Sequence, residues 1–280
     1  VYYVISGINS NANLTLDYQG AAHASGSVSY SAYVQGQEVG AANVTTSQIN
    51  GNFNVLPVND GATVLAPSNV VGAEDQRIVL PISVSLADSS ETIASITLSN
   101  VPNGVLVFSG SGAPGSQAIN MGEMPGNPGF TVWGIPLLSG TTPSYIALLP
   151  APNWSGTINA LQLGVWAGEA GLDPQLYNHT LSVTVNGVAD GIHLTPTLSF
   201  GNAGDKVALN LNSSMPDHDG SELATLSIKN LGAHASFYSG SSLLTASYNL
   251  ASDTYTLTNL TADQVSSLSV SQKAGNYDLL

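Results

Sequence analysis

The sequence repeats itself after about 130 residues. The stretch VGAEDQRIVLPISVSLADSSETIASITLSN recurs, with substitutions, as GNAGDKVALNLNSSMPDHDGSELATLSIKN. Asp75 recurs as Asp205, 130 positions later, and Glu91 recurs as Glu222 after 131 positions. A fixed period of this length indicates that one structural unit occurs in tandem. The chain is therefore expected to fold as consecutive copies of one domain type.

A second set of matching motifs lies outside that stretch. DYQG at residue 17 corresponds to NWSG at 153, VQGQEVG at 34 to VWAGEAG at 165, and PVNDG at 57 to GVADG at 187. The offsets vary between 130 and 136, as loop insertions would make them. Together the two sets delimit a complete unit over residues 61–190. Residues 1–60 hold only the later strands of a unit, and residues 191–280 hold only the earlier ones.

Both incomplete units lie at the ends of the chain, and two explanations fit them. In the first, the 280 residues are a piece of a longer array. In the second, another chain completes each end by adding strands in trans. We expect the first. The second stays open because a sheet edge without a partner promotes aggregation.

Short segments in which apolar and polar residues alternate make up most of the chain. Examples are VSYSAYV, RIVLPISVSL, HTLSVTV and YTLTNL. This alternation is typical of half-buried strands, and regular strand spacing favours β-sandwiches. We predict an all-β chain of tandem Ig-like or cadherin-like sandwiches in an elongated array. The one helical signal is LTADQVSSL at residues 260–268, where Thr261 is placed to cap a short turn.

The charge balance excludes several classes of partner. The chain has 18 Asp and Glu residues but only four Lys and Arg, a formal net charge of −14. Nucleic acids and anionic membrane surfaces are bound by clustered Lys and Arg, and no cluster is present. No apolar run approaches the roughly 18 residues of a membrane helix, and the absence of cysteine excludes disulfides and thiolate ligands. A hydrophobic content of 43% nevertheless predicts buried cores.

No enzyme signature is found in the sequence. The five histidines have no zinc-binding spacing, and neither a nucleophile elbow nor a phosphate-binding loop is present. We expect no catalytic activity. The alternative function is a module that recognises a glycan or peptide through an inserted loop at residues 110–130. Trp133 follows the insertion, although core packing is the simpler role for its ring.

The repeat resembles a known family. The stretch AEDQRIVLPISVSLADSSETIASITLSNVPNG, followed by APNWSGTI and GVADG, is similar to the cadherin-like or Ig-like extender repeats of giant bacterial RTX-type, biofilm-associated adhesins. The resemblance covers residues 61–280, and its later half covers residues 1–60. It implies a secreted, cell-surface rod of β-sandwiches whose partners are neighbouring repeats of the same protein. It also implies Ca²⁺ at the junctions between repeats.

The resemblance assigns two sets of calcium ligands. The junction before the complete unit would use Asp60 from the linker, Glu74 and Asp75 near the first strand, and Asp88 and Glu91 from the ADSSE loop. The next junction would use Asp190, Asp205, Asp217, Asp219 and Glu222. ADSSE lacks the second Asp and the Gly of DHDGSE, and Gly204 stands where the first copy has Glu74. Each set thus lacks one expected carboxylate.

Calcium also fits these residues on physical grounds. Ca²⁺ takes about six to eight oxygen ligands, so it needs acids that lie together without competing bases. The stretch MPDHDGSE places Asp217, Asp219 and Glu222 within six positions. A solvated β-turn is the alternative for this stretch alone, since Asp, Gly and Ser favour turns. An EF-hand is excluded because Ile228 stands at the twelfth position, where an acid is required.

We therefore expect a structural, non-enzymatic and calcium-stiffened segment of a bacterial surface adhesin or extracellular filament. Its role would be in adhesion or in the assembly of a biofilm matrix. The glycan- or peptide-recognition module on the same sandwich remains the alternative.

Overall fold

The computed structural model describes residues 3–9, 13–112, 115–137, 141–202, 204–216, 220 and 222–272. Strands make up 53% of the structure and one short helix lies in this described part, which confirms the predicted all-β class. The strands form several small sheets, and their arrangement as tandem Ig-like sandwiches stays a prediction. No helix within these ranges has the length and apolar character needed to cross a lipid bilayer.

The chain divides into two compact units. The first comprises Val1–Thr63, Ser85–Ala94 and Val165–Tyr177. The second comprises Val64–Val84, Ser95–Gly164 and Asn178–Leu280. The boundaries fall inside several strands, so a single strand can have residues in both units.

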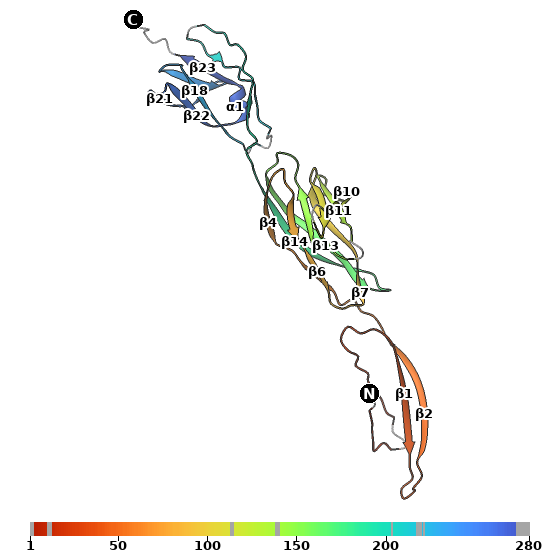
Figure 1. Ribbon diagram of the computed structural model, residues 1–280. Coiled ribbons are helices and arrows are strands. Elements are labelled where there is room, and N and C mark those ends of the chain that lie inside the picture. The colour runs from red at the N-terminus through yellow and green to blue at the C-terminus, as the bar shows by residue number, and fades with distance from the viewer. Residues whose placement is uncertain are drawn as a thin grey trace. The chain divides into compact units, whose positions relative to one another are not determined.

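The first unit contains an antiparallel ribbon of two long strands, β1 (Gly26–Gly36) and β2 (Thr45–Val55), which Figure 1 shows side by side. Side chains alternate between the two faces of the ribbon. Its apolar face includes Val28, Tyr30, Ala32, Val34, Ile49, Phe53 and Val55. Its polar face includes Ser29, Ser31, Gln35, Gln48, Asn50 and Asn52.

An aromatic group occupies the centre of the apolar face. Tyr30 lies directly opposite Gly51, and a Cβ atom at Gly51 would overlap the Tyr30 hydroxyl, so a larger residue there would displace the ring. Phe53 packs against Tyr30 with ring centroids 6.3 Å apart and against Tyr18 with centroids 5.0 Å apart. Tyr30 is nevertheless 48% exposed, so these contacts leave much of the face open to solvent.

The largest sheet has six strands. Their order is β10 (Ile119–Glu123), β11 (Phe130–Ile135), β7 (Glu91–Pro102), β13 (Gly156–Glu169), β14 (Gln175–Asn186) and β4 (Asn69–Ala73). Figure 1 shows these strands side by side. The edge strand β4 runs parallel to β14, with Asn69 opposite Ser182 and Ala73 opposite Asn186. The carboxyl-terminal ends of both strands therefore lie at the same end of the sheet.

A second, four-stranded sheet has the order β5 (Ile78–Pro81), β12 (Tyr145–Leu149), β8 (Leu106–Gly110) and β9 (Ser116–Gln117). The short strands β3 (Ala62–Leu65) and β6 (Ser83–Leu86) pair separately. Burial alternates along β3, β5 and β6 as the sequence predicts, whereas β8 and β12 are buried at consecutive positions. In β5, Ile78 and Leu80 are 3% and 1% exposed, whereas Val79 between them is 51% exposed.

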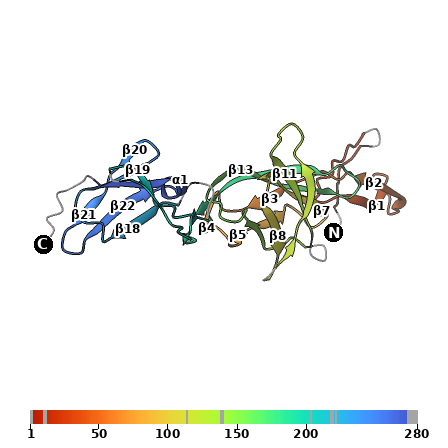
Figure 2. The ribbon, with the colours of Figure 1, turned by 90° about the horizontal axis from the view of Figure 1, so that it is seen from above.

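The last third of the described chain forms three small sheets. One has the order β16 (Val207–Ala208), β23 (Leu268–Gln272), β19 (Ala235–Ser239) and β20 (Ser242–Leu244). Another has the order β18 (Ala224–Lys229), β22 (Thr254–Leu260) and β21 (Ser247–Asn249), seen side by side in Figure 2. The third pairs β15 (His193–Leu194) with β17 (Ser213–Ser214). Their buried core comprises Met215, Ala224, Phe237, Tyr255, Leu257, Leu260, Val265 and Leu268.

The short helix α1 (Ala262–Ser266) lies where the sequence predicts a helical turn. The Thr261 hydroxyl accepts a hydrogen bond from the Gln264 backbone N–H, and the Gln264 side chain accepts one from the Thr261 backbone N–H. This reciprocal pair is a capping box, which satisfies two backbone donors at the start of a helix. The predicted N-cap role of Thr261 is confirmed.

The four-stranded sheet recurs one repeat later with the same strand order. β16, β23, β19 and β20 take the places of β5, β12, β8 and β9. In each copy a cation stacks on the aromatic ring of the repeated FSGS or YSGS motif. Arg77 lies 3.6 Å from the ring centroid of Phe108, and Lys206 lies 3.9 Å from that of Tyr238. The sequence repeat thus has a structural counterpart in this sheet.

Leu148→Ala should lower the free energy of unfolding by about 2–5 kcal/mol, because this β12 side chain is fully buried and its truncation leaves a cavity. Leu243→Ala makes the same change at a position that is 67% exposed in β20, and it should cost less than about 0.5 kcal/mol. Urea denaturation followed by circular dichroism measures both. Equal losses in the two variants would contradict the burial pattern.

Candidate functional site

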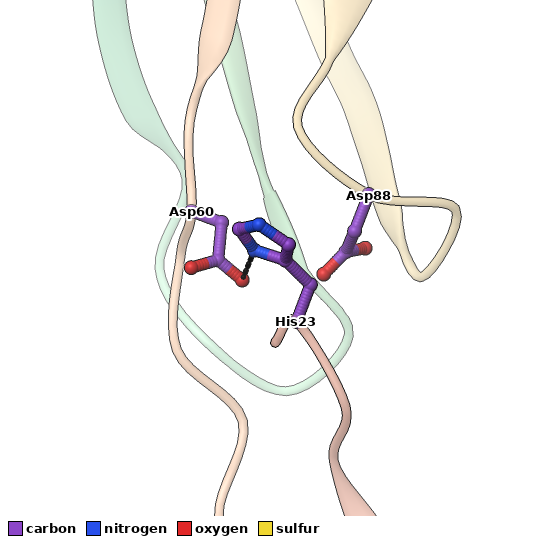
Figure 3. Close-up of side chains that lie close together, drawn as sticks. All are labelled: His23, Asp60 and Asp88. Carbon is purple, nitrogen blue, oxygen red and sulfur yellow. Dashed lines mark ion pairs between the residues drawn. The ribbon is translucent and has the colours of Figure 1, made fainter. Parts of the chain in front are cut away.

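Three separate segments of the first unit bring His23, Asp60 and Asp88 together (Figure 3). One potential ligand atom of each side chain lies within 4.8 Å of the other two. His23 precedes β1, Asp60 lies between β2 and β3, and Asp88 lies in the loop between β6 and β7. His23 Nδ1 lies 2.9 Å from Asp60 Oδ2. We call these three residues the His23–Asp60–Asp88 cluster.

Local hydrogen bonds hold Asp88 within its loop. Its Oδ1 accepts from the Ser90 backbone N–H at 2.7 Å, from the Ser90 hydroxyl at 2.5 Å and from the Glu91 backbone N–H at 3.0 Å. Asp ahead of Ser commonly forms such a turn. These bonds use one oxygen only. The other, Asp88 Oδ2, is buried and no hydrogen-bond donor reaches it.

Glu91 connects this loop to the segment that carries Asp60. Its Oε1 accepts from the backbone N–H of Asp60 at 2.6 Å and of Gly61 at 2.9 Å. The side chain is buried, with 3% exposure, yet its Oε2 has no hydrogen-bond donor. Of the five residues predicted for the first junction, the structure therefore brings together Asp60, Asp88 and Glu91.

Glu169, at the end of β13, is a buried acid that the sequence reasoning missed. Its Oε1 accepts from the Ser25 hydroxyl at 2.9 Å, and its Oε2 accepts from the Val58 backbone N–H at 3.1 Å. The Glu169 backbone N–H donates to Asn59 Oδ1 at 2.8 Å. Glu169 thus holds residues 58–59 just ahead of Asp60. Glu169 could have been found from the sequence, because it occupies the same place in the VWAGEAG motif as Glu38 in the VQGQEVG motif.

The cluster changes the acid–base properties of two of its members. The hydrogen bond to Asp60 raises the pKa of His23 above its ordinary value of 6.5, and the negative charges of Asp60, Asp88 and Glu91 act in the same direction. The hydrogen bond from the Ser90 hydroxyl lowers the pKa of Asp88 below its ordinary value of 3.8. The hydrogen bonds that Asp88 accepts from the backbone N–H groups of Ser90 and Glu91 lower this pKa further. Both shifts favour the charged forms, an imidazolium beside ionised carboxylates.

Glu74 belongs to the second unit, whereas Asp60, Asp88 and Glu91, with which the sequence grouped it, belong to the first. It follows β4, and its Oε1 accepts a short hydrogen bond from the Val188 backbone N–H, while its backbone N–H donates to the Asn186 carbonyl at 3.0 Å. The parallel pairing of β4 with β14 explains these two contacts, because the residues that follow the two strands lie together at one end of the sheet. Glu74 is 1% exposed, and no donor reaches its Oε2.

Asp75 also contacts residues of the second unit. Its Oδ1 accepts from the Asn153 backbone N–H at 3.0 Å, and the Asn153 side chain donates to the Pro216 carbonyl at 2.9 Å. Pro216 begins the PDHDGSE stretch. The structure therefore places Glu74 and Asp75 beside the GVADG segment and the start of the acidic loop, both predicted for the next junction.

The remaining predicted ligands have mixed outcomes. Glu222 has a buried Oε2 without a donor. Asp205 is exposed and accepts a hydrogen bond from Asn202 Nδ2 at 3.1 Å, and Asp190 is exposed. Asp217 and Asp219 lie outside the described residues. The predicted second set is thus not assembled by the contacts of the described residues, apart from the approach of the acidic loop to Asn153.

Buried carboxylate oxygens without a donor are concentrated in the predicted ligands. Among the described residues, the carboxylate atoms with this property belong to Glu74, Asp88, Glu91 and Glu222. A buried carboxylate oxygen that accepts no hydrogen bond is costly, and a cation relieves this cost. The first unit contains no Lys or Arg in its sequence. Within their own unit, the oxygens of Asp88 and Glu91 therefore have no Lys or Arg side chain, and His23 is the basic group that lies near them.

Trp133 packs as a core residue, as the simpler interpretation of the sequence expects. It is 2% exposed, and its indole N–H donates to Thr131 Oγ1 at 2.9 Å. The ring therefore offers no open face on which a sugar could stack.

No protein-family model matches the chain, and no curated protein matches it.

Titration by nuclear magnetic resonance should give His23 a pKa above 6.5, and Asp60→Asn should lower that pKa, because the charged partner is lost. The folded-state pKa is raised, so the stability that the pair contributes is present below pH 6.5. It is lost as the pH rises through the raised value. Glu38→Gln, an exposed acid in the same unit, is the control and should leave the His23 titration unchanged. An unchanged His23 pKa in Asp60→Asn would contradict the pairing.

Proposed function

We propose that this chain is a structural, non-enzymatic segment of a secreted bacterial surface adhesin or extracellular filament, in which Ca²⁺ stiffens tandem Ig-like or cadherin-like sandwiches. The observation that carries the proposal is the set of buried carboxylate oxygens without donors at Glu74, Asp88, Glu91 and Glu222. The repeated four-stranded sheet and the sparsely charged sequence support a rod built from one domain type.

The first candidate site has the spacing that a single ion requires. Two oxygens that bind one Ca²⁺ at about 2.3–2.6 Å stand at most about 5 Å apart. The ligand atoms of Asp60 and Asp88 meet this condition, since they lie within 4.8 Å of each other. Glu91 is not among the residues with ligand atoms this close, but its Oε1 is bound to the backbone of Asp60 and Gly61, so its negative charge would attract a cation to this segment. Backbone carbonyls and water would complete the coordination.

Binding at this site would order the segment between β2 and β3. Glu91 and Glu169 hold the backbone N–H groups of Val58, Asp60 and Gly61, so the acids already fix the course of this segment. An ion held by Asp60 on the segment and by Asp88 on a separate loop would join the two. Glu74, bound to the Val188 backbone N–H, offers the same arrangement in the GVADG segment. A metal bound by the folded state alone stabilises that state by mass action.

His23 is the residue of the cluster that calcium does not need. Ca²⁺ takes oxygen ligands, whereas an imidazole nitrogen suits Zn²⁺ and other transition metals. Without a metal, the His23 imidazolium supplies the positive charge beside Asp60. Ca²⁺ would replace that charge, and His23 would then leave Asp60.

Millimolar Ca²⁺ should raise the melting temperature and extend the chain in small-angle scattering, and EDTA should reverse both effects. At a free concentration 100 times the dissociation constant, one site adds about 2.7 kcal/mol to the free energy of unfolding. Asp88→Asn should remove most of the calcium-dependent gain in the first unit, since it deletes a negative ligand. Glu38→Gln removes an exposed acid of the same unit as the matched control. If neither Ca²⁺ nor EDTA changes the melting temperature or the scattering profile, the proposal is excluded.

Metal selectivity should separate a calcium site from a zinc site in the same cluster. His23→Asn should leave calcium binding in place, because the oxygen ligands remain. It should weaken Zn²⁺ binding by at least about tenfold, since even changes outside the ligand sphere can cost that much. Isothermal titration of both metals against the wild type and His23→Asn measures this. A loss of Ca²⁺ binding in His23→Asn would assign the imidazole a direct role.

A further inference from the structure

The segment VNDG between β2 and β3 is bound along its backbone by residues that come later in the chain. Glu169 Oε2 accepts a hydrogen bond from the Val58 backbone N–H at 3.1 Å. Glu91 Oε1 accepts from the backbone N–H groups of Asp60 at 2.6 Å and of Gly61 at 2.9 Å. These acceptors and the segment all belong to the first unit. The segment is therefore held as an extended peptide would be held in a binding site.

Asn59, the second residue of this segment, is bound through its side chain. Its Oδ1 accepts from the Glu169 backbone N–H at 2.8 Å, and its Nδ2 donates to the Asp173 carbonyl at 2.9 Å. These partners lie 110 and 114 positions away, whereas an Asn that only favours a turn bonds to its near neighbours. The reversed amide would place an NH₂ group against the Glu169 N–H. The two bonds thus require an amide in one orientation.

Gly168, at the end of β13, makes room for this amide. A Cβ atom at Gly168 would lie 2.8 Å from Asn59 Oδ1 and 3.2 Å from Pro174 Cα, closer than ordinary van der Waals contact. Gly168 is itself buried. The Asn59 side chain therefore packs directly against the backbone of β13, and a larger residue at position 168 would displace it.

The last residue of the segment is also restricted. Gly61 has a φ of +113°, in the region that favours glycine. Its carbonyl accepts from the Ala87 backbone N–H at 2.9 Å. Val58, at the start of the segment, is 64% exposed, so it is bound through its backbone alone. The contacts therefore select Asn and Gly within VNDG and leave the Val side chain unrecognised.

The corresponding segment one repeat later reads VADG. Ala189 stands there in place of Asn59, and its methyl group can neither accept nor donate a hydrogen bond. The Val188 backbone N–H of that segment is bound by Glu74. The chain thus holds two related segments of different sequence, and the difference falls on the side chain that makes the bonds to Glu169 and Asp173.

The residues that contact the VNDG segment are Ala87, Glu91, Gly168, Glu169 and Asp173, which we call the linker site. We propose that the linker site recognises an extended Asn-Asp-Gly segment by its sequence, with Asn59 as the specificity-determining residue, and that it holds this segment without a metal.

The atoms that make these contacts support binding without an ion. They are backbone N–H and carbonyl groups, the Asn59 amide, and carboxylate oxygens of Glu91 and Glu169. Neither carboxylate belongs to the His23–Asp60–Asp88 cluster. The second oxygen of Glu169 accepts from the Ser25 hydroxyl, so both of its oxygens are already bound within the protein. The site therefore places Asp60 before any cation arrives.

Amide hydrogen exchange, followed by nuclear magnetic resonance on the whole chain in EDTA, tests this. Asn59→Ala converts VNDG into VADG and removes both side-chain bonds. Exchange of the Glu169 backbone N–H should accelerate about tenfold or more, because its acceptor is lost. The N–H groups of Val58 and Gly61 should accelerate with it, since the segment opens more often. The amide of Leu148, in β12, should keep its rate.

Asn54→Ala is the matched control, because it truncates an exposed Asn of the same unit five positions earlier. It should leave the exchange of Glu169 and Gly61 unchanged. An unchanged Glu169 rate in Asn59→Ala, or equal acceleration in Asn54→Ala, would overturn the proposal. Acceleration of Leu148 by the same factor as Glu169 would also overturn it, because the loss would then be one of global stability.

Two further variants test the fit of the amide. Asn59→Asp keeps one oxygen but replaces the donor with an oxygen that faces the Asp173 carbonyl, so it should accelerate the same amides. Gly168→Ala should do so as well, since the added Cβ would displace the Asn59 side chain. In a chain that already carries Asn59→Ala, Gly168→Ala should add little, because the displaced atom is absent. Wild-type rates in Asn59→Asp, or fully additive effects of the other two changes, would reject the recognition of Asn59.

The comparison in EDTA separates this proposal from the calcium-dependent function. A chain that does not respond to Ca²⁺ but loses protection at Glu169 in Asn59→Ala would support the linker site and exclude the calcium role. A chain that is stabilised by Ca²⁺ but keeps its protection in Asn59→Ala would do the reverse. Each proposal can therefore fail alone.

Discussion

The carboxylate of Glu91 is the interaction on which the organisation of the first unit depends. One of its oxygens binds the backbone N–H groups of Asp60 and Gly61, and the other is buried without a donor. The side chain therefore fixes the connecting segment and at the same time leaves a negative charge uncompensated. Because the unit contains no Lys or Arg, the groups available within it to balance this charge are His23 and an ion from solution.

Much of the architecture followed from local patterns in the sequence. Alternation of apolar and polar residues identified the strands, and the Thr261 cap identified the one short helix, because both signals depend on neighbouring residues. The close spacing of acidic residues in a chain with few basic residues also indicated which side chains were candidate metal ligands. The sandwich arrangement and the calcium role go beyond these local signals and stay predictions.

What the sequence did not provide was the grouping of those acids. Glu74 and Asp75 lie near Val188 and Asn153 because β4 pairs in parallel with β14, a contact between strands more than 100 positions apart. His23 contacts Asp60 through the fold as well, since the two residues lie in separate segments and no sequence motif contains both. Such contacts are decided by which strands pair, and a single sequence with no alignment carries little information about that.

The parallel pair of β4 and β14 has a mechanical consequence. β4 opens the six-stranded sheet in chain order and β14 closes it, so tension along the chain would pull the two strands in opposite directions along their length. The bonds of the five residue pairs from Asn69–Ser182 to Ala73–Asn186 run across the strands and would bear the load together. A strand pair loaded in this way must break all of its bonds at once, whereas one peeled from an end breaks them singly. The same ladder that positions Glu74 would therefore resist extension of the repeat.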